Sequence, residues 1–207
     1  MCEIKKATLG RLPAYLEYLN GLPEQTEFVS SSSIAVGLGF GDVQVKKDLN
    51  AVCGKGRPKT GYKVSELIAD VKKALSKDKE TEAVLVGFGK LGRAIGDYGG
   101  FKKFGLKISA VFDSDSEKFG KIVGGKAVLP LSEFKTYCEA HNVRIGIITV
   151  PSEAAQSVCD LMTDSGIKAI WNFAPAKITA KGDVIIKNED LSLSLAYLNV
   201  CLDKINR

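Results

Sequence analysis

The sequence is poor in the residues that hold metal ions. Its 207 residues include one histidine, His141, and five cysteines that are scattered along the chain without a C-x-x-C pair. Zinc sites of the usual ligand spacing are therefore disfavoured, and we expect no metal site. We expect the cysteines to be reduced and mostly buried. Cys53 lies among cations that would lower a thiol pKa, which leaves redox sensing open at this position.

Long apolar runs are also absent. No run reaches transmembrane length, and the chain starts without the apolar segment of a signal peptide. These two observations predict a cytoplasmic protein with no membrane partner. Hydrophobic residues make up 45% of the chain, which suffices for a buried core. The length allows two small domains.

The chain divides into segments of different periodicity. A polar stretch near 76–81 separates a region of helical periodicity from a region in which short apolar runs alternate with helical patterns. Such alternation predicts βαβ units and a parallel sheet. We therefore expect an α/β protein with segments 1–78, 79–188 and 189–207. The strands are expected near 83–86, 107–112, 127–129, 143–150, 168–173 and 184–187.

The most informative motif is the glycine pattern at 87–92. An apolar run leads into G-x-G-x-x-G, and a second apolar run ends at Asp113. This order is typical of a dinucleotide-binding fingerprint, in which the glycines allow a tight turn, close approach of a pyrophosphate and close packing of a helix. The pyrophosphate would sit at the helix N-terminus. Asp113 would accept a hydrogen bond from a ribose hydroxyl and repel a 2′-phosphate, which favours NAD(H) over NADP(H).

Two further strand ends complete the expected cofactor site. Ligands of open α/β sheets bind beyond the carboxyl ends of the strands, where Pro151 and Pro175 follow two of the expected strands. The alternative is that these prolines only stop the strands. The cofactor-binding residues predicted from the motifs are Gly87, Phe88, Gly89, Lys90, Leu91, Gly92, Asp113, Thr149, Val150, Pro151, Asn172, Phe173 and Ala174.

The N-terminal segment predicts three short helices. Pro13 suits the first turn of a helix, where its missing N–H costs nothing, and Gly21 would end this helix. Ser30–Ser33 supply N-cap candidates for a second helix, and a third helix is expected from about Asp42 to Val52. Two short helices joined by a glycine turn, the second of them basic on its outer face, predict a helix-turn-helix.

A basic loop at 54–61 follows the third helix. It fits a wing between two short strands, and 64–75 predicts a closing amphipathic helix. The resulting winged helix, in a chain of net charge +5, suits double-stranded DNA as a partner. The alternative is a generic helical domain with a solvated, charged face.

The expected DNA contacts fall into base-reading and backbone-binding groups. By helical spacing, Gln44 suits the major-groove edge of adenine and Lys47 that of guanine. The expected contacts to phosphates or to a narrow minor groove are Ser31, Ser32, Lys46, Arg57 and Lys59.

The last segment, 191–205, is apolar on more than one face. Its leucines cannot all point into one small sheet, and a helix that is hydrophobic nearly all round has to be buried. This pattern predicts a homodimer in which the second subunit covers the helix or exchanges it.

Taken together, the motifs resemble Rex, the family of bacterial redox-sensing transcriptional repressors. The likeness covers nearly the whole chain, and its most specific stretches are 45–49, 87–92, 112–115, 149–156 and 172–175. The resemblance implies a dimer with a winged-helix domain that binds operator DNA and a Rossmann-like domain that binds NAD(H). It also implies that NADH releases the operator, and that the C-terminal helix is swapped onto the partner subunit.

The resemblance further implies three switch residues. Arg11 matches an N-terminal arginine of the family, which also makes it a candidate DNA contact. Tyr98 matches a tyrosine near the nicotinamide, and Asp190 an acid that exchanges partners between two states. The alternatives are a phosphate-binding arginine, a core tyrosine and an acid at a helix N-terminus.

The sequence departs from the family pattern in two places. In the wing, 51–53 replaces an aromatic pair and 57–59 replaces part of the glycine spacing, which leaves the minor-groove contact and the operator open. Lys90 stands where the family more often has a small or amide residue, and it would strengthen the hold on phosphate.

Two other functions remain as alternatives. An NAD-dependent oxidoreductase would need a proton donor or acceptor beside its substrate. Tyr98-x-x-x-Lys102 mimics a reductase pair, but two glycines make a helical spacing doubtful and no segment remains for a substrate domain. A nucleotide sensor with a protein or coenzyme A ligand is disfavoured by the basic helix face. We therefore expect no enzyme and no catalytic residues.

Overall fold

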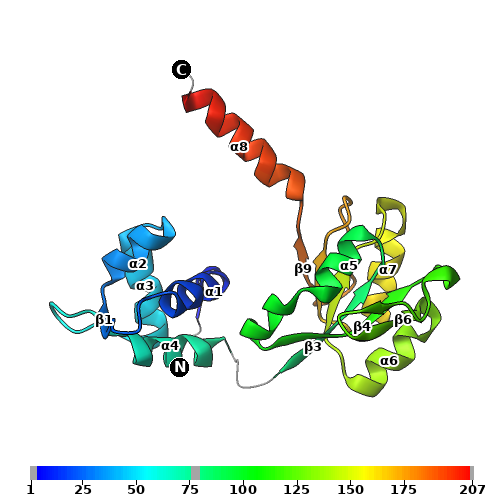
Figure 1. Ribbon diagram of the computed structural model, residues 1–207, viewed down its shortest axis with the longest axis horizontal. Helices are drawn as coiled ribbons and strands as arrows, with labels where there is room; N and C mark the ends of the chain where they lie inside the picture. Colours follow the sequence, from blue (N-terminus) through cyan, green and yellow to red (C-terminus); the bar gives the residue numbers. More distant parts are fainter. Residues whose placement is uncertain (1–3, 76–79, 206–207) are drawn as a thin grey trace. The chain divides into compact units, whose positions relative to one another are not determined.

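The computed structural model describes residues 4–75 and 80–205. The chain forms two compact units, one ending at Glu80 and the other beginning at Thr81 (Figure 1).

The N-terminal unit is a small helical unit with a two-stranded ribbon. One core joins apolar side chains of all its helices, and its fully buried members include Leu12, Tyr15 and Leu49. The described elements are α1 (Lys6–Asn20), β1 (Phe28–Val29), α2 (Ser31–Leu38), α3 (Asp42–Cys53), β2 (Tyr62–Lys63) and α4 (Val64–Ala74).

Helices α2 and α3 confirm the predicted helix-turn-helix. Ser30 caps α2, because its hydroxyl accepts a hydrogen bond from the backbone N–H three residues further on, at 3.0 Å. Gly39 ends α2 with a φ of 66°, in the left-handed region that favours glycine. The inner face of α3 buries Val45 and Leu49, both 0% exposed.

Helix α1 corrects the prediction for Pro13, which lies inside the helix and not at its start. Proline in a helix interior removes one backbone hydrogen bond and crowds the preceding carbonyl. Leu12 and Tyr15 flank the proline and are both fully buried, so packing of this face holds the helix together on either side of it. The carbonyl left without its partner belongs to Leu9, whose side chain is 38% exposed and therefore on the solvent side.

The sequence predicts a wing between two short strands, but the basic loop directly follows α3 and only its downstream end leads into a strand. Its following strand, β2, pairs in antiparallel fashion with β1, which precedes α2. The loop itself is closed by backbone hydrogen bonds in both directions between Arg57 and Gly61, at 2.7 and 2.9 Å. Lys59, between them, has a φ of 66°. This left-handed conformation costs a residue with a side chain about 1 kcal/mol.

A buried carboxylate ties α1 to α3. Asp48 is 3% exposed and accepts hydrogen bonds from Thr8 Oγ1 (2.8 Å), Arg11 Nε and Nη2 (2.7 and 2.8 Å) and Tyr15 Oη (2.7 Å). Burial alone would raise the pKa of Asp48, but the hydrogen bonds from Arg11, Tyr15 and Thr8 outweigh it and lower the pKa. Asp48 is therefore an ionised, fully paired group inside the unit.

The C-terminal unit contains a seven-stranded sheet in the order β5-β6-β4-β3-β7-β8-β9. All neighbours are parallel except β5 and β6. Without β5, which the sequence pattern does not predict, this is the strand order of the doubly wound dinucleotide-binding fold. The predicted fold class is therefore confirmed. The strands are β3 (Thr81–Val86), β4 (Leu106–Asp113), β5 (Ile122–Val123), β6 (Lys126–Pro130), β7 (Ile145–Ile148), β8 (Ala169–Asn172) and β9 (Ile185–Asn188).

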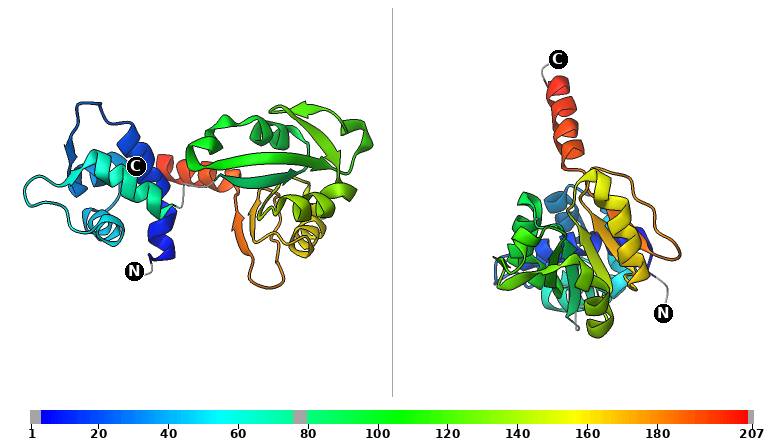
Figure 2. Two further views of the ribbon diagram at one scale, coloured as in Figure 1. Left: turned by 90° about the horizontal axis from the view of Figure 1, so that it is seen from below. Right: turned by 90° about the vertical axis from the view of Figure 1, so that its right-hand side faces the viewer.

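Helices cover both faces of this sheet. One face packs against α6 and α7 through a core that includes Phe112 and Phe134, and the other packs against α5 and η1 through a core that includes Leu85 and Val111. In the left view of Figure 2 the sheet separates α5 from α6 and α7. The helical elements are α5 (Lys90–Asp97), η1 (Gly99–Phe104), η2 (Ser116–Lys118), η3 (Leu131–Glu133), α6 (Phe134–His141) and α7 (Ser152–Asp164).

The last helix, α8 (Leu191–Ile205), follows β9 (Figure 1). Its apolar side chains are exposed to solvent. These side chains are 54% to 70% exposed, and they are Leu191, Leu193, Leu195, Tyr197, Leu198, Val200 and Leu202. The burial that such a helix needs is not supplied by the described part of its own chain. Within residues 4–75 and 80–205, every helix is too short or too polar to cross a membrane.

We predict that Asp48→Asn lowers the free energy of unfolding by about 2–3 kcal/mol. The substitution keeps the shape of the side chain but removes the charge that pairs with Arg11, which is itself 26% exposed, so that water moderates the loss. Urea denaturation at neutral pH measures the effect. The control is Glu66→Gln, which removes two exposed pairs, with Arg57 and with Lys63, each at 3.8 Å, and should change stability by less than about 1 kcal/mol.

A comparison of the wild type with Asp48→Asn also tests the charge of Asp48. Because its pKa is lowered in the folded state, its stabilisation is complete above the unfolded pKa of about 3.9 and is lost as the pH falls through the folded pKa. Below about pH 4 the stability of the wild type should therefore fall more steeply than that of Asp48→Asn. Identical pH slopes in the two proteins would contradict this assignment.

Candidate functional site

Three glycines shape the loop between β3 and α5. Gly87 has a φ of 107°, and a Cβ there would lie 2.7 Å from the carbonyl oxygen of Thr149. A Cβ on Gly92 would lie 1.8 Å from the carbonyl oxygen of Gly87, so only glycine lets α5 pack against the loop. A Cβ on Gly89 would have no atom within 4 Å. The predicted turn and packing roles are confirmed, and the open side of Gly89 is where a ligand would approach the backbone.

Asp113, at the end of β4, closes the loop from the neighbouring strand. Its carboxylate accepts hydrogen bonds from the N–H groups of Phe88 (2.6 Å) and Asp115 (2.9 Å) and from Lys118 Nζ (3.2 Å to each oxygen). Burial would raise the pKa of Asp113, but these backbone and ammonium hydrogen bonds outweigh it and lower the pKa. The site therefore keeps a negative charge where the sequence predicts a ribose contact.

A cavity of about 480 Å³ lies beside the glycine loop. Its volume is in the usual range of small-molecule sites. The predicted residues that line it are Gly87, Gly89, Asp113, Thr149, Val150 and Pro151. Sequence analysis missed further lining residues, namely Ser114, Asp115, Lys118, Leu131, Ala154, Ser157 and Val158. Most of these residues directly follow a strand or lie in the first turns of α7. They could have been found from the rule that ligands of open α/β sheets bind beyond the carboxyl ends of the strands.

Thr149 braces the loop at the point where the strand order reverses. Its Oγ1 lies 3.1 Å from the carbonyl oxygen of Val86 and 2.8 Å from that of Gly87, so the two carbonyl oxygens share its one donor proton. The hydroxyl is thus used within the chain, and it holds the end of β7 against the turn that follows β3.

The side chain of Asn172 makes its hydrogen bonds within the chain. It is fully buried, and its amide donates to the carbonyls of Ala174 (3.4 Å) and Ala176 (3.0 Å) and to Asn188 Oδ1 (2.9 Å). Its own Oδ1 accepts from the N–H of Ala174 (3.0 Å). The side chain therefore orders the turn after β8. Contact of Asn172 with a cofactor stays a prediction.

The remaining predicted cofactor residues lie outside the cavity lining. The rings of Phe88 and Phe173 and the side chain of Leu91 belong to the core on the α5 side of the sheet. Ala174 is 5% exposed in the core on the opposite side. Lys90, the first residue of α5, has an exposed side chain beside the helix N-terminus.

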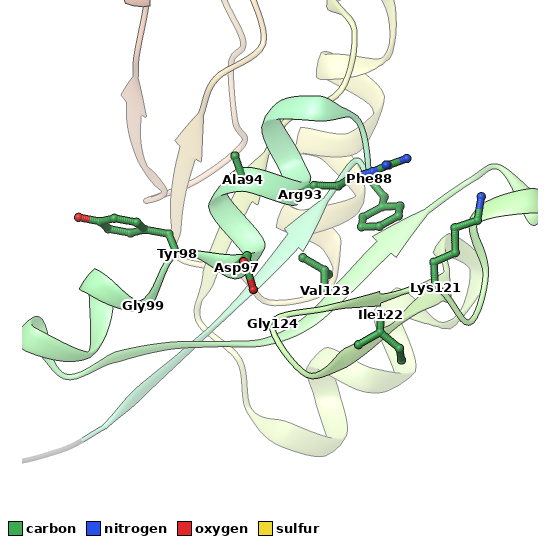
Figure 3. Close-up of a pocket in the computed structure, with 10 residues that line it drawn as sticks. All are labelled: Phe88, Arg93, Ala94, Asp97, Tyr98, Gly99, Lys121, Ile122, Val123 and Gly124. Carbon is green, nitrogen blue, oxygen red and sulfur yellow. The ribbon is translucent and has the colours of Figure 1, made fainter.

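A larger groove, of about 730 Å³, follows α5 and β5 (Figure 3). Its lining includes Phe88, Arg93, Asp97, Tyr98, Lys121 and Ile122. The guanidinium of Arg93 lies 4.6 Å from the centre of the Phe88 ring, a cation–π distance. Tyr98 is 62% exposed, and Figure 3 shows its ring directed away from Ile122 and Val123. The groove carries charges of both signs and identifies no particular ligand.

Tyr98 starts a line of aromatic contacts that sequence analysis missed. Its ring packs edge-on against Phe101 (5.0 Å between centroids), Phe101 against Trp171 (5.9 Å), and Trp171 against Phe173 (4.4 Å). Trp171 Nε1 also donates to Glu189 (3.2 Å), just before α8. The line thus connects a predicted switch residue, a predicted cofactor residue and the segment that leads into the last helix.

The outer face of α3 is exposed and basic. Gln44, Lys46 and Lys47 are all exposed, opposite the buried Val45. On the loop that follows, Lys59 and Arg57 are exposed, with Arg57 Nη2 3.8 Å from a carboxylate oxygen of Glu66. These five predicted DNA contacts are therefore accessible.

The other three predicted DNA contacts are engaged or partly covered. Arg11 directs its guanidinium to Asp48, and its contact with DNA stays a prediction. The hydroxyl of Ser32 donates to Asp42 Oδ1 at 2.7 Å, and Ser31 is half-buried. Sequence analysis assigned no role to Asp48. The signal that could have found it is its position between Val45 and Leu49 on the buried stripe of α3.

Cys53 also corrects an expectation. Burial raises the pKa of its thiol to about 12, with a further contribution from the charge of Asp70. Its Sγ donates to the carbonyl oxygen of Leu49 at 3.0 Å. The neighbouring cations therefore do not activate this thiol, and it stays protonated near neutral pH.

Asp190 lies at the start of α8. It is exposed, and its Oδ1 accepts hydrogen bonds from the N–H and the hydroxyl of Ser192. These bonds lower the pKa of Asp190. In the single chain the acid therefore caps the last helix.

Two family models match the chain. One is described as "CoA binding domain" and matches residues 78–176, and the other as "Putative DNA-binding protein N-terminus" and matches residues 3–50. The first match lies almost wholly in the C-terminal unit, which begins at Thr81, and the second lies in the N-terminal unit.

Curated relatives are similar over nearly the full length. A protein of Treponema denticola is 41% identical over 197 residues, which are 95% of this chain and 94% of that protein. A protein of Syntrophomonas wolfei is 40% identical over 206 residues, which are 99% of this chain and 98% of that protein. Both are named redox-sensing transcriptional repressor Rex.

Solved structures of RSP, a Rex-family repressor, agree with this fold. RSP in complex with β-NAD⁺ and operator DNA is 32% identical with a TM-score of 0.89, and covers 100% of this chain and 95% of its own. RSP in complex with β-NADH is 31% identical with a TM-score of 0.87, and the match covers 100% of this chain and 97% of the RSP chain. Because these relatives are repressors, the oxidoreductase alternative is not favoured. The chain belongs to the Rex family of redox-sensing transcriptional repressors.

Proposed function

We propose that this protein binds operator DNA as a cytoplasmic homodimer and is released from it by NADH, so that it reports the NADH/NAD⁺ ratio. The observation that carries the proposal is the pairing of two features in one chain. The first is an exposed, basic α3, and the second is a glycine loop that leaves Gly89 open beside a cavity. The complexes of RSP with both cofactor forms and with operator DNA support the same assignment.

In this proposal the glycine loop holds the pyrophosphate of NAD(H). Backbone N–H groups at the start of α5 and the positive end of the helix dipole favour anions there. The exposed Lys90 adds a charge that stabilises the pyrophosphate of either redox form. Thr149, Val150 and Pro151 form the facing wall.

Asp113 selects NAD(H) over NADP(H). Its lowered pKa keeps it ionised at neutral pH. The ammonium of Lys118 is shared with a second carboxylate, that of Asp115 at 3.5 Å, so this corner of the site stays net negative. A 2′-phosphate would therefore meet repulsion.

On DNA, α3 would lie in the major groove. Gln44 and Lys47 read base edges, while Lys46 binds phosphate. Arg57 and Lys59 extend the contact to the minor groove. Ser31 and Ser32 remain candidates at the start of α2, although the tie of Ser32 to Asp42 makes it the weaker of the two.

The homodimer would form through α8. Its exposed apolar side chains need a cover, and the same face of a second copy supplies one with the symmetry usual for such dimers. An exchanged helix, as the family resemblance implies, is one such arrangement.

Coupling between the two sites needs only differential affinity. If NADH prefers an arrangement of the dimer that misfits the operator, it weakens DNA binding, and DNA weakens NADH binding by the same factor. A roughly 100-fold effect needs about 2.8 kcal/mol. We propose that Arg11, Tyr98 and Asp190 take part in the switch between the two arrangements. One or two rearranged charged hydrogen bonds would supply this free-energy difference.

A specific observation weakens the enzyme alternative. Tyr98 has an extended backbone, and η1, a 3₁₀-helix, follows it, so Tyr98 and Lys102 do not share an α-helix as the reductase pair would require. His141 stacks on Tyr137 at the end of α6, far along the chain from the glycine loop.

The proposed function predicts that NADH dissociates the protein from DNA. In a gel-shift assay on the promoter of its own gene, NADH should release the complex at concentrations at which NAD⁺ does not. The shift should weaken steeply as salt rises, because several phosphate contacts release counterions. DNA binding that ignores NADH, or the absence of any shift, would refute the proposal.

Two glycine variants separate ligand approach from folding. Gly89→Ala adds a methyl group in open space and should keep the melting temperature, yet weaken NADH binding at least about tenfold because it fills the pyrophosphate approach. Gly92→Ala places its methyl group 1.8 Å from the carbonyl oxygen of Gly87 and should destabilise the C-terminal unit. NADH fluorescence titration and thermal denaturation measure both effects. Normal NADH affinity in Gly89→Ala would contradict the assignment.

Two neighbouring lysines test the division of DNA contacts. Lys47→Ala should relax the preference for one base pair by about 1–3 kcal/mol. Lys46→Ala should weaken binding to all sequences and reduce the salt slope by about one phosphate contact. Both lysines are exposed on α3, so each variant controls for the other. Equal losses on every sequence would reject the division.

A further inference from the structure

We propose that Val43 reads a thymine methyl group in the major groove, a specificity contact beyond those assigned above. The inference rests on the proposed binding of DNA through α3. It starts from an apolar side chain that the fold leaves exposed: Val43 is 66% exposed in the first turn of α3, whereas Val45 and Leu49 on the inner face are fully buried.

The position of Val43 on the helix places it with the predicted base-reading residues. It precedes Lys47 by one turn, so the two side chains neighbour each other on the outer face. Gln44 is exposed beside them. First-turn residues of a recognition helix are those that contact base edges.

The start of α3 leaves room for this contact. Gly41 caps the helix without a side chain. Asp42, the first residue, is held by the hydroxyl of Ser32 at 2.7 Å, which fixes its carboxylate toward α2. Val43 and Gln44 are then the first side chains that a groove would meet.

The chemistry of Val43 selects its partner. A β-branched residue is a poorer helix former than alanine, so an exposed valine gains α3 nothing by itself. In the major groove, the C5-methyl of thymine is the apolar group that bases present to a protein. The exposed lysines around Val43 fit a polyanion and disfavour an apolar protein surface at the same place.

A methyl deletion in the DNA tests the contact directly. Duplexes are first selected from a random pool by the full-length wild type, and each thymine of the selected site is then replaced by deoxyuridine, which lacks only the methyl group. One thymine position in each half-site should respond. A single replacement there should lower the affinity of the wild type about four- to fivefold relative to the thymine duplex. Val43→Ala changes both subunits of the proposed homodimer, so it should bind the thymine duplex about 16- to 25-fold more weakly and should lose nothing further with deoxyuridine.

The control is Val36→Ala, because Val36 is 85% exposed on α2 and is not among the predicted contacts. This variant should keep the wild-type sensitivity to deoxyuridine. Circular dichroism and thermal melting of both variants should match the wild type, which excludes misfolding as the cause of lost affinity.

The outcomes separate this inference from the function beneath it. If Val43→Ala stays as sensitive to deoxyuridine as the wild type, or if no position responds in either protein, the thymine contact is refuted while DNA binding stands. If no duplex is enriched from the pool, the proposed function falls, and the inference falls with it.

Discussion

The N-terminal unit depends on one buried ion pair. Asp48 lies on the inward face of the helix whose outward face carries the lysines, and all of its hydrogen bonds come from α1. Apolar packing alone would hold α3 against α1 without fixing its rotation or its position along the axis. A carboxylate with three partners on one neighbouring helix fixes both, since any slip would leave a charge buried and unpaired. The orientation of the basic face therefore follows from the buried one.

The C-terminal unit uses the same device at its own site. Asp113 is buried, carries a lowered pKa and bonds to a lysine and to the backbone of the glycine loop. Here the carboxylate holds a loop open, with Thr149 bracing the opposite side. A loop that must approach a ligand closely cannot bury its own backbone, so its shape has to be imposed by the ends of the strands around it. Preorganisation of this kind lowers the entropy cost of binding.

Sequence reasoning was most successful where glycine geometry decides the structure. The roles of Gly87 and Gly92 were predictable because each position tolerates no side chain. It failed where tertiary partners override a local preference. Pro13 lies inside a helix because buried residues flank it on both sides, and no local rule reveals that burial.

The candidate site was predictable only as far as the strand ends. Asn172 follows the pattern of a cofactor wall, yet its side chain serves the turn after β8. The aromatic line from Tyr98 to Phe173 joins residues of distant segments, so no spacing in the sequence indicates it. Asp48 shows the same limit: a charged residue between lysines looks solvated until its partners on another helix are known.

The bonds of Arg11 constrain how any switch can work. Its guanidinium already makes two hydrogen bonds to a buried carboxylate. Removing it without replacement would leave Asp48 with only hydroxyl donors, at a cost comparable to the whole coupling energy of an allosteric protein. A switch through Arg11 therefore has to exchange partners and not merely break a pair. Either a second cation takes over Asp48, or Arg11 keeps one bond to Asp48 while the other moves to a second acid. The second route needs no extra cation, and the side chain of Arg11 is 26% exposed.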